Sequence, residues 1–402
     1  MQKKIIALAI AAAISAPAFA DTSNVTVYGI ADVSYDSIKT GTPTAAGAAA
    51  GVTSNRVSSN TSRLGLKGSE DLGDGLSAVW QIESLINIGD NSATAGTTIG
   101  TRNTFAGLSS ASAGTVVLGR HDTPYKISTR AYDLFGDGIA DNRAIMGGNS
   151  FATVNANGTL ATSGAYQATA AASFDGRQNQ VLAYISPKLG GVATLAIGYV
   201  NLNPAQNTTA SNKSTATSVA GMFDIGSGFG AALAYEVHDV TTIAVAPLAA
   251  GAKEKATKLG LSYAQDAFAV NFAYEKTSDN FGSVLGAATA GGDLWGHNAY
   301  YLSGKYSVTA NDTIKAAFTK ASTLAMAGTA ASANTDAKQF TVGYDHSLSK
   351  RTYVYALYTK LTNGSAAGYS LGSGTSSVGG VTTSAGLGAS PSALAFGMRH
   401  TF

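Results

Sequence analysis

Short and long connections alternate strictly along this chain, and that alternation limits what it can fold into. The short connections fall at 71–75, 109–114, 187–191, 225–228, 264–267, 309–312 and 347–350. The long ones, rich in Ala, Thr, Ser, Gly and Asn, fall at about 39–60, 88–101, 123–176, 202–217, 241–254, 278–297, 321–336 and 362–391. Seven short and eight long connections predict sixteen strands, with both termini on the short-turn side. This is the layout of an all-β, 16-stranded antiparallel transmembrane β-barrel with tight turns at one end.

The segments between these connections alternate with a period of two. In the last segment, Leu394, Phe396, Met398, His400 and Phe402 share one face of the predicted strand. An ordinary soluble sandwich also alternates in this way, so a single segment is weak evidence. A sandwich, however, has no reason to separate short from long connections. A closed barrel also leaves no unpaired edge, which lipid would not tolerate.

The first twenty residues read as a cleaved secretory signal peptide, which makes 21–402 the barrel domain. Lys3 and Lys4 precede an apolar run at 5–14, and small residues up to Ala20 supply a cleavage site before Asp21. The alternative is a retained membrane helix, but ten to twelve apolar residues are fewer than the roughly 20 that span a bilayer. The signal predicts export through the inner membrane.

Composition agrees with a barrel that meets lipid on one face and water on the other. Charged residues make up 12% of the chain, Gly is abundant at 47 and Cys is absent. Low charge without an apolar run long enough for a spanning helix is typical of such a barrel, and the missing Cys excludes a disulfide scaffold. Removing Lys3 and Lys4 leaves 24 basic against 24 acidic residues. Net charge therefore gives no support to a nucleic-acid partner.

Several ordered motifs resemble the general porins of the β-proteobacterial and neisserial type. They are VTVYGIAD (25–32), SRLGLKGSEDLG (62–73), GTVVLGR (114–120), YISPKLGG (184–191), TVGYDHSLSKRT (341–352) and GMRHTF (397–402). The resemblance covers essentially the whole of 21–402. It implies a homotrimer of barrels in the cell outer membrane, in contact with its lipid and lipopolysaccharide. Each pore would be narrowed by an inward-folded third loop and would pass small hydrophilic solutes and ions. No metal-ligand spacing or phosphate-cradling loop appears in the sequence, so neither a cofactor nor a metal is expected.

The third loop at 123–176 supplies the acidic groups that the resemblance assigns to the pore constriction. These are Asp133, Asp137 and Asp141, and Arg130 and Arg143 lie in the same segment. A barrel of this size otherwise leaves a wide aqueous lumen. Backbone inside it is permitted because it lines water. The alternative is an external, solvated loop.

The resemblance also carries a row of wall arginines onto Arg63, Arg102 and Arg177. Alternation places Arg63 and Lys67 in the lumen, opposite Leu64 and Leu66, and it makes Glu83 an acidic partner there because Ile82 faces lipid. The same reasoning points Arg102 inward, because it opposes Phe105. Arg177 fits less well, since it shares parity with Val181 and Ile185, and a bulge would have to rescue it. Arg120 shares the parity of Val116 and Leu118 and is more doubtful.

Opposed charges across a narrow passage create a transverse field, and rows of Arg bias a pore toward anions. The hypothesis is a passive channel with weak anion preference. Mutual ion pairing of the same residues inside the wall is the alternative, and it is compatible with that role.

Three other readings share parts of this evidence. An enzymatic barrel would need a nucleophile and an orienting partner near His238 or His297, and none is evident locally. An adhesin or structural barrel would place its function in the long loops, although small filled barrels serve that purpose more often. A substrate-specific channel would differ only in its lumen residues, so the sequence leaves it open as the alternative function.

Overall fold

In the computed structural model the chain forms one closed antiparallel barrel of sixteen strands, as the connection lengths predict. The structure describes residues 24–44, 50–89, 99–147, 174–202, 215–239, 253–280, 292–325, 333–372 and 386–402. The predicted signal peptide at 1–20 lies outside the described residues. None of the helices in the described ranges is long and apolar enough to cross a membrane.

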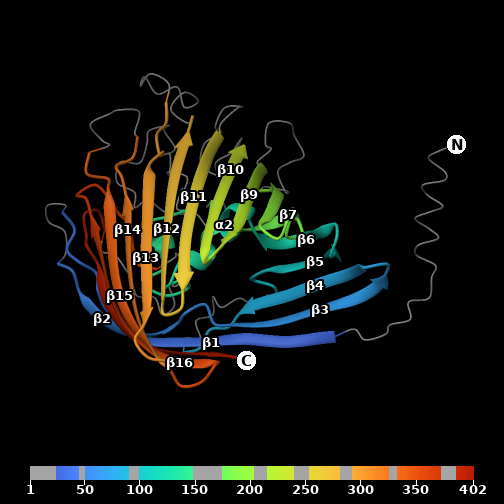
Figure 1. Ribbon diagram of the computed structural model, residues 1–402. Coiled ribbons are helices and arrows are strands. Elements are labelled where there is room, and N and C mark those ends of the chain that lie inside the picture. The colour runs from blue at the N-terminus through green and yellow to red at the C-terminus, as the bar shows by residue number, and fades with distance from the viewer. Residues whose placement is uncertain are drawn as a thin grey trace.

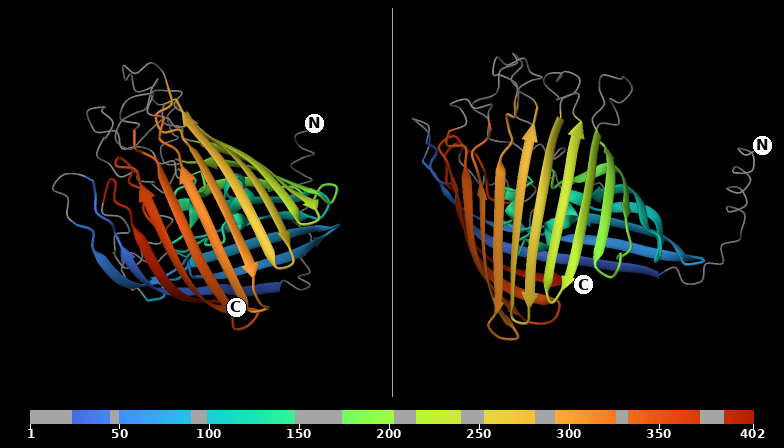
Figure 2. Two further views of the ribbon diagram at one scale, coloured as in Figure 1. Left: turned by 60° about the vertical axis from the view of Figure 1, so that its left-hand side comes forward. Right: turned by 45° about the horizontal axis from the view of Figure 1, so that its top comes forward.

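Figure 1 and Figure 2 show the strands as a curved wall around an interior that holds helical segments. The strands are β1 (Asn24–Lys39), β2 (Thr53–Ser59), β3 (Arg63–Gly73), β4 (Leu76–Leu85), β5 (Thr104–Ser110), β6 (Gly114–Asp122), β7 (Arg177–Ile185), β8 (Ala193–Asn201), β9 (Thr215–Gly226), β10 (Phe229–Asp239), β11 (Lys253–Gln265), β12 (Phe268–Asp279), β13 (Asn298–Ser307), β14 (Asp312–Ala321), β15 (Ala337–Ser347), β16 (Thr352–Asn363) and β17 (Ser392–Thr401). Between β6 and β7 lie α2 (Pro124–Thr129) and the 3-10 turns η1 (Arg130–Tyr132) and η2 (Asn142–Ala144).

Two of the seventeen segments, β2 and β3, form a single barrel strand with a break at 60–62. Both pair with the same side of β1, β3 with its first half and β2 with its second half. At the break, the Ser62 hydroxyl accepts from the Asp32 backbone N–H at 2.9 Å and donates to the Asp32 carbonyl at 2.9 Å. The prediction of a loop over 39–60 is therefore wrong for 53–59. These residues form a strand, but they are mostly polar and lack the apolar alternation that indicates one.

The ring closes where the first strand meets the last. Gly29 and Phe402 exchange two backbone hydrogen bonds, of 3.0 Å and 3.1 Å, and β1 pairs with β17 from Ile30 to Lys39. Closure matters because a backbone group left unpaired in hydrocarbon costs several kcal/mol.

Outward faces carry large apolar side chains, and inward faces carry small or polar ones. The predicted face of β17 is confirmed, since Leu394, Phe396 and Met398 are exposed to the outside while Ala393 and Ala395 are buried. The main apolar core lies between the third loop and the inner wall, where loop residues such as Phe135, Ile139 and Met146 pack on inward alanines of β12 to β17. The described part of the third loop therefore lies inside the barrel, and for that part the external alternative is wrong.

Barrel closure predicts a specific steric effect at Gly29. A Cβ there would lie 2.3 Å from the Phe402 ring and 2.6 Å from the Arg63 carbonyl oxygen. We expect Gly29→Ala to cost about 1–3 kcal/mol through overpacking, measured as a lower unfolding temperature by circular dichroism in detergent. Gly304→Ala is the matched control, because its Cβ would meet nothing closer than 3.6 Å. Equal unfolding temperatures for the two variants would contradict the account of closure.

Candidate functional site: a charged constriction

The third loop begins with α2, which lies against the inner wall of the barrel. A side-chain cap stabilises the start of this helix, and a glycine on the wall leaves room for it. Thr123 caps α2 by accepting a hydrogen bond from the Lys126 backbone N–H at 3.3 Å, and Pro124 begins the helix. Proline suits the first helical position because its missing N–H would be unpaired there anyway. A Cβ at residue 198 would lie 2.9 Å from the Pro124 ring, so Gly198 on β8 allows α2 to approach the wall.

A buried carboxylate holds both ends of the described part of the loop. Glu275 on β12 accepts from the Tyr125 hydroxyl at 2.7 Å and from the Gly147 backbone N–H at 2.8 Å. Lys258 on β11 balances this charge, with its Nζ 3.5 Å from Glu275 and 2.5 Å from Asp175. Hydrogen bonds to a charged group contribute about 1.5–3 kcal/mol each, so this cluster fixes the loop firmly against the wall.

The middle of the loop is fixed on β13 and β14. The Tyr301 hydroxyl donates to Asp133 at 3.0 Å and accepts from the Leu134 backbone N–H at 3.3 Å. The Lys315 ammonium donates to the Leu134 carbonyl at 3.3 Å and lies 4.9 Å from the centre of the Phe135 ring. The loop thus has few ways to move without breaking buried contacts.

Two loop arginines gather the three predicted acidic residues into one hub. Arg130 contacts Asp137 at 2.8 Å, Asp141 at 3.0 Å and Asp133 at 3.4 Å. Arg143 contacts Asp141 at 2.9 Å. Burial and the negative charge of Asp141 raise the pKa of Asp133 to about 6. Burial opposes ionisation of Asp137 too, but the charges of Arg130 and Arg63 outweigh it and lower the pKa of Asp137.

Asp137 also reaches across to the barrel wall. Arg63 donates to its carboxylate at 3.1 Å, and the Thr61 hydroxyl at the break between β2 and β3 donates to the Asp137 carbonyl at 3.1 Å. Asp137 has a left-handed φ of 72° between Gly136 and Gly138, a conformation that Asp tolerates better than most residues. On the β2/β3 side of the barrel, the loop therefore meets the wall through this ion pair and the Thr61 hydrogen bond.

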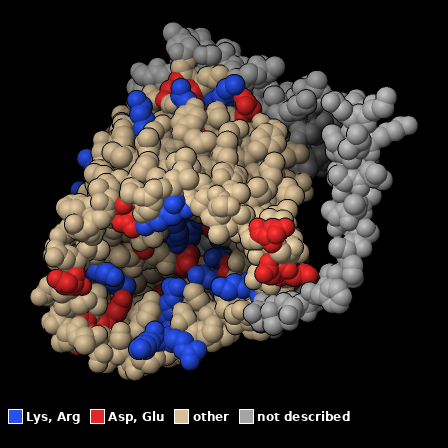
Figure 3. Space-filling view, turned by 45° about the vertical axis from the view of Figure 1, so that its right-hand side comes forward, with Lys and Arg blue, Asp and Glu red and all other residues tan. Residues whose placement is uncertain are grey.

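On the wall side, Glu83 links the first two predicted arginines. Arg102 donates to it at 2.5 Å and the Arg63 Nε lies 3.8 Å away, while the Tyr28 hydroxyl donates at 3.0 Å. Lys67 lies four residues after Arg63 on the same inward face of β3, with its Nζ 5.3 Å from the centre of the Tyr28 ring. Figure 3 shows the molecule hollowed on one side, with basic and acidic side chains gathered around the hollow.

Arg177 belongs to a second cluster at the entrance of the loop. It lies 3.1 Å from Asp122 and donates to Asn103 at 2.6 Å. The Lys126 ammonium on α2 contacts the same carboxylate at 2.8 Å. Burial lowers the pKa of Lys126 to about 8, although the charge of Asp122 opposes the change.

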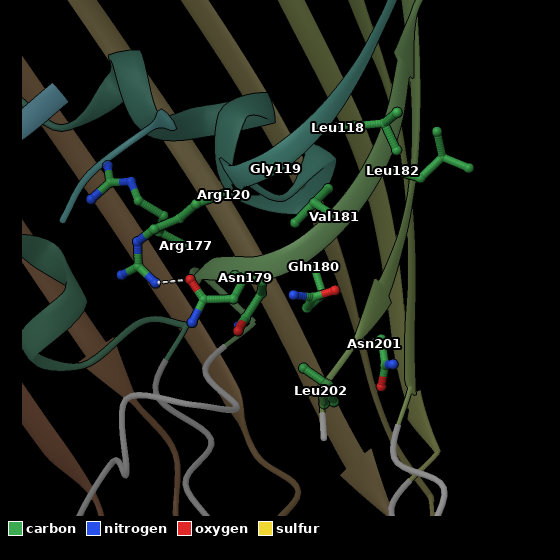
Figure 4. Close-up of a pocket in the computed structure, with 11 residues that line it drawn as sticks. Leu118, Gly119, Arg120, Arg177, Asn179, Gln180, Val181, Leu182, Asn201 and Leu202 are labelled. Atoms are coloured by element: carbon green, nitrogen blue, oxygen red, sulfur yellow. Dashed lines mark hydrogen bonds between the residues drawn. The ribbon is translucent and has the colours of Figure 1, made fainter. Parts of the chain in front are cut away.

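Arg120, which alternation left doubtful, also points into the lumen. In Figure 4 it projects with Arg177 away from Leu118 and Leu182, and these residues help line a cavity of about 740 Å³. Its guanidinium donates to the Thr101 carbonyl at 3.1 Å and to Asn179 at 2.5 Å. Gly119 has a φ of 145° and the strand register shifts beside it, so a backbone irregularity overrides the parity.

The structure brings all eight predicted constriction residues to the inner side, but two of the reasons given for them were wrong. Arg102 precedes β5, and Phe105 itself faces inward against buried Val117 and Val181. Val181 faces inward as well, so its parity with Arg177 was never an obstacle. Sequence reasoning missed Asp122, Lys126 and Tyr28. The sequence did offer a signal for the first two residues. Asp122 lies two residues after the motif that ends at Arg120, and Lys126 lies near the start of α2.

Within the described ranges, the basic groups of this region outnumber the carboxylates. The basic side chains are Arg63, Lys67, Arg102, Arg120, Lys126, Arg130, Arg143 and Arg177, and the acidic ones are Glu83, Asp122, Asp133, Asp137 and Asp141. No group of three or more His, Cys, Asp or Glu side chains that could hold a metal occurs in that part of the chain.

A closed outer-membrane barrel narrowed by an internal loop, with charged groups lining the passage, is a channel for passive diffusion. Comparison with known families agrees with this class, because the family described as Gram-negative porin matches residues 7–366. The chain belongs to the Gram-negative porin family.

Individual relatives match this chain over different lengths. Outer membrane porin protein 32 of Delftia acidovorans is 29% identical over the whole of both chains. An outer membrane porin protein of Bordetella pertussis is 36% identical over 38% of this chain and 42% of its own. Among solved structures, an anion-selective porin from Comamonas acidovorans matches 95% of this chain and 100% of its own, with a TM-score of 0.71 and 26% identity.

The raised pKa of Asp133 predicts a pH-dependent selectivity. As the pH falls through about 6, this carboxylate gains a proton and the hub loses one negative charge. We expect the anion-to-cation permeability ratio to rise between pH 7.5 and pH 5, measured by single-channel reversal potentials in a KCl gradient. Asp133→Asn should already show the higher ratio at pH 7.5 and lose this step. An unchanged pH step in the variant would assign it to another group.

Proposed function

We propose that this porin passes small hydrophilic solutes and ions with a weak preference for anions. The observation that carries the proposal is the excess of basic groups around the passage between the barrel wall and the third loop. Asp137 and Asp141 are each neutralised by the loop's own arginines. Arg120 and Lys67 have no carboxylate partner within 4.0 Å among the described residues. Positive charge therefore dominates on the wall side of the passage.

The physical mechanism is a field along a narrow passage lined by opposite charges. Wall arginines and the acidic hub meet at the Arg63–Asp137 ion pair, and the charged groups beside that contact orient polar solutes, while the low-dielectric barrel around them concentrates the field. Apolar solutes gain nothing on entering, whereas a small anion exchanges water for guanidinium donors. The solved porin that this chain resembles at 26% identity is described as anion-selective, which supports the same sign here.

The family resemblance further supports a homotrimer of barrels as the working assembly. It also supports removal of a signal peptide after Ala20, and β1 begins shortly afterwards, at Asn24. Both remain part of the proposal.

Removing one wall charge should reduce the preference for anions. A unit charge 6–8 Å from the ion path in a medium close to water contributes about 0.5–1 kcal/mol, so Arg63→Ala should lower the anion-to-cation permeability ratio about twofold to fivefold. The readout is the reversal potential of single channels in a salt gradient at pH 7.5. Lys255→Ala is the control, because Lys255 is exposed on the outward face of β11. A ratio that is cation-selective in the unmodified porin, or unchanged in Arg63→Ala, would refute the proposal.

A further inference from the structure

Three neighbouring strands each place an exposed lysine on the outward face at the long-loop end of the barrel. Lys320 lies at the end of β14, Lys338 at the start of β15 and Lys360 near the end of β16. Figure 1 and Figure 2 show these strands in the same part of the wall, and they pair in that order. Because the long loops are external in such barrels, the three lysines lie at the outer surface of the membrane.

The strand register brings the three ammonium groups together. Lys320 and Lys338 are direct cross-strand partners, which puts their Cβ atoms about 5 Å apart. Lys360 is the partner of Phe340, two residues after Lys338, so those two lysines are diagonal neighbours at about 7–8 Å. Like charges directly opposite each other destabilise a sheet. An anion bound between the ammonium groups would relieve this repulsion.

No carboxylate of the described residues supplies that anion. None lies within 4.0 Å of the three lysines, although Asp336 is only two residues before Lys338. The adjoining loop segments 326–332 and 373–385 contain neither Asp nor Glu in the sequence. By contrast, outward-facing Lys253 contacts Asp239 at 2.9 Å. Neither the described residues nor these two loop segments therefore offer a balancing charge, and a bound anion can supply it.

Directly below the lysines, the outward face is apolar. Phe318 and Phe340 are cross-strand partners and lie two residues from Lys320 and Lys338. Both rings are exposed to the outside, as is Tyr358 beside Lys360. An anion that fits this face has a charged head at the level of the lysines and apolar chains along the rings. Lysine stems can extend along the apolar surface while their ammonium groups reach such a head.

We propose that Lys320, Lys338 and Lys360 form a binding site for the phosphorylated headgroup of an outer-leaflet lipid. The phosphate oxygens accept charge-assisted hydrogen bonds from the ammonium groups, and the acyl chains pack on Phe318 and Phe340. A free phosphate ion would neutralise the lysines but leave the aromatic surface unused, so the lipid is the better fit. This site lies on the outside of the barrel and is independent of the passage inside it.

Lipid binding can be measured by native mass spectrometry of the full-length folded porin in a neutral detergent, titrated with diphosphorylated lipid A. Each lysine near an anionic headgroup should contribute about a fivefold change in affinity. We expect Lys338→Gln to weaken binding by about that factor and the triple variant Lys320→Gln, Lys338→Gln, Lys360→Gln to abolish measurable binding. Lys338→Arg should retain it.

The matched control is Lys350→Gln in the short turn between β15 and β16. Lys350 is also an exposed lysine of these strands, but it lies at the opposite, short-turn end of the barrel. Its removal should leave lipid A binding unchanged. Equal loss in Lys350→Gln, or full binding by the triple variant, would overturn the proposal. So would complete displacement of the lipid by equimolar inorganic phosphate, which would identify the ligand as a free ion.

Thermal unfolding gives a second measurement of lipid binding. If Lys338 only stabilised the sheet, the effect of Lys338→Gln on the unfolding temperature would not depend on lipid A. In neutral detergent without lipid A, Lys338→Gln removes a like-charge repulsion, so its unfolding temperature should equal or exceed that of the unmodified porin. With saturating lipid A the order should reverse, because the unmodified porin gains more from the ligand. An order that is the same with and without lipid A would contradict the site.

Discussion

Hydrocarbon offers no hydrogen bonds to a backbone, and the architecture of this porin follows from that constraint. Every spanning strand must be paired on both sides, so the chain has to close on itself. The two bonds between Gly29 and Phe402 and the β1–β17 ladder complete the ring. Sixteen strands then enclose a lumen too wide to select among small solutes. The narrowing has to come from a segment that is free of the membrane constraint because it lines water.

The third loop fulfils that role because both of its faces are used. One face packs on the inner wall of β12 to β17, where inward alanines leave room for Phe135, Ile139 and Met146. Glu275 fixes the two ends of its 125–147 stretch, and Tyr301 fixes the middle of that stretch. The other face presents the Arg130–Asp137 hub to the wall arginines. The main apolar core of the protein is thus the interface between the loop and the wall. The same interface positions the charged side chains of the passage.

Sequence alone predicted the features set by the membrane and missed those set by the loop. Strand number, turn positions and the outward face of β17 follow from a binary contrast between lipid and water. That contrast fails where the inner wall is itself apolar, as at Phe105 and Val181, which alternation misread as facing lipid. Backbone irregularities could not be predicted either. No residue type indicates the break at 60–62, or the register shift beside Gly119 that directs the Arg120 side chain inward. The roles of Arg63 and Asp137 came from family resemblance, and their contact from the fold.

The central claim is that the third loop lies across the passage with Asp137 facing the wall. The chain has no cysteine, so Asp137→Cys gives a unique thiol for a bulky, positively charged methanethiosulfonate reagent. We expect its addition to lower the single-channel conductance in discrete steps, while the same modification at Lys255→Cys on the outer face leaves the conductance unchanged. Unaltered conductance in a fully modified Asp137→Cys porin would contradict the account.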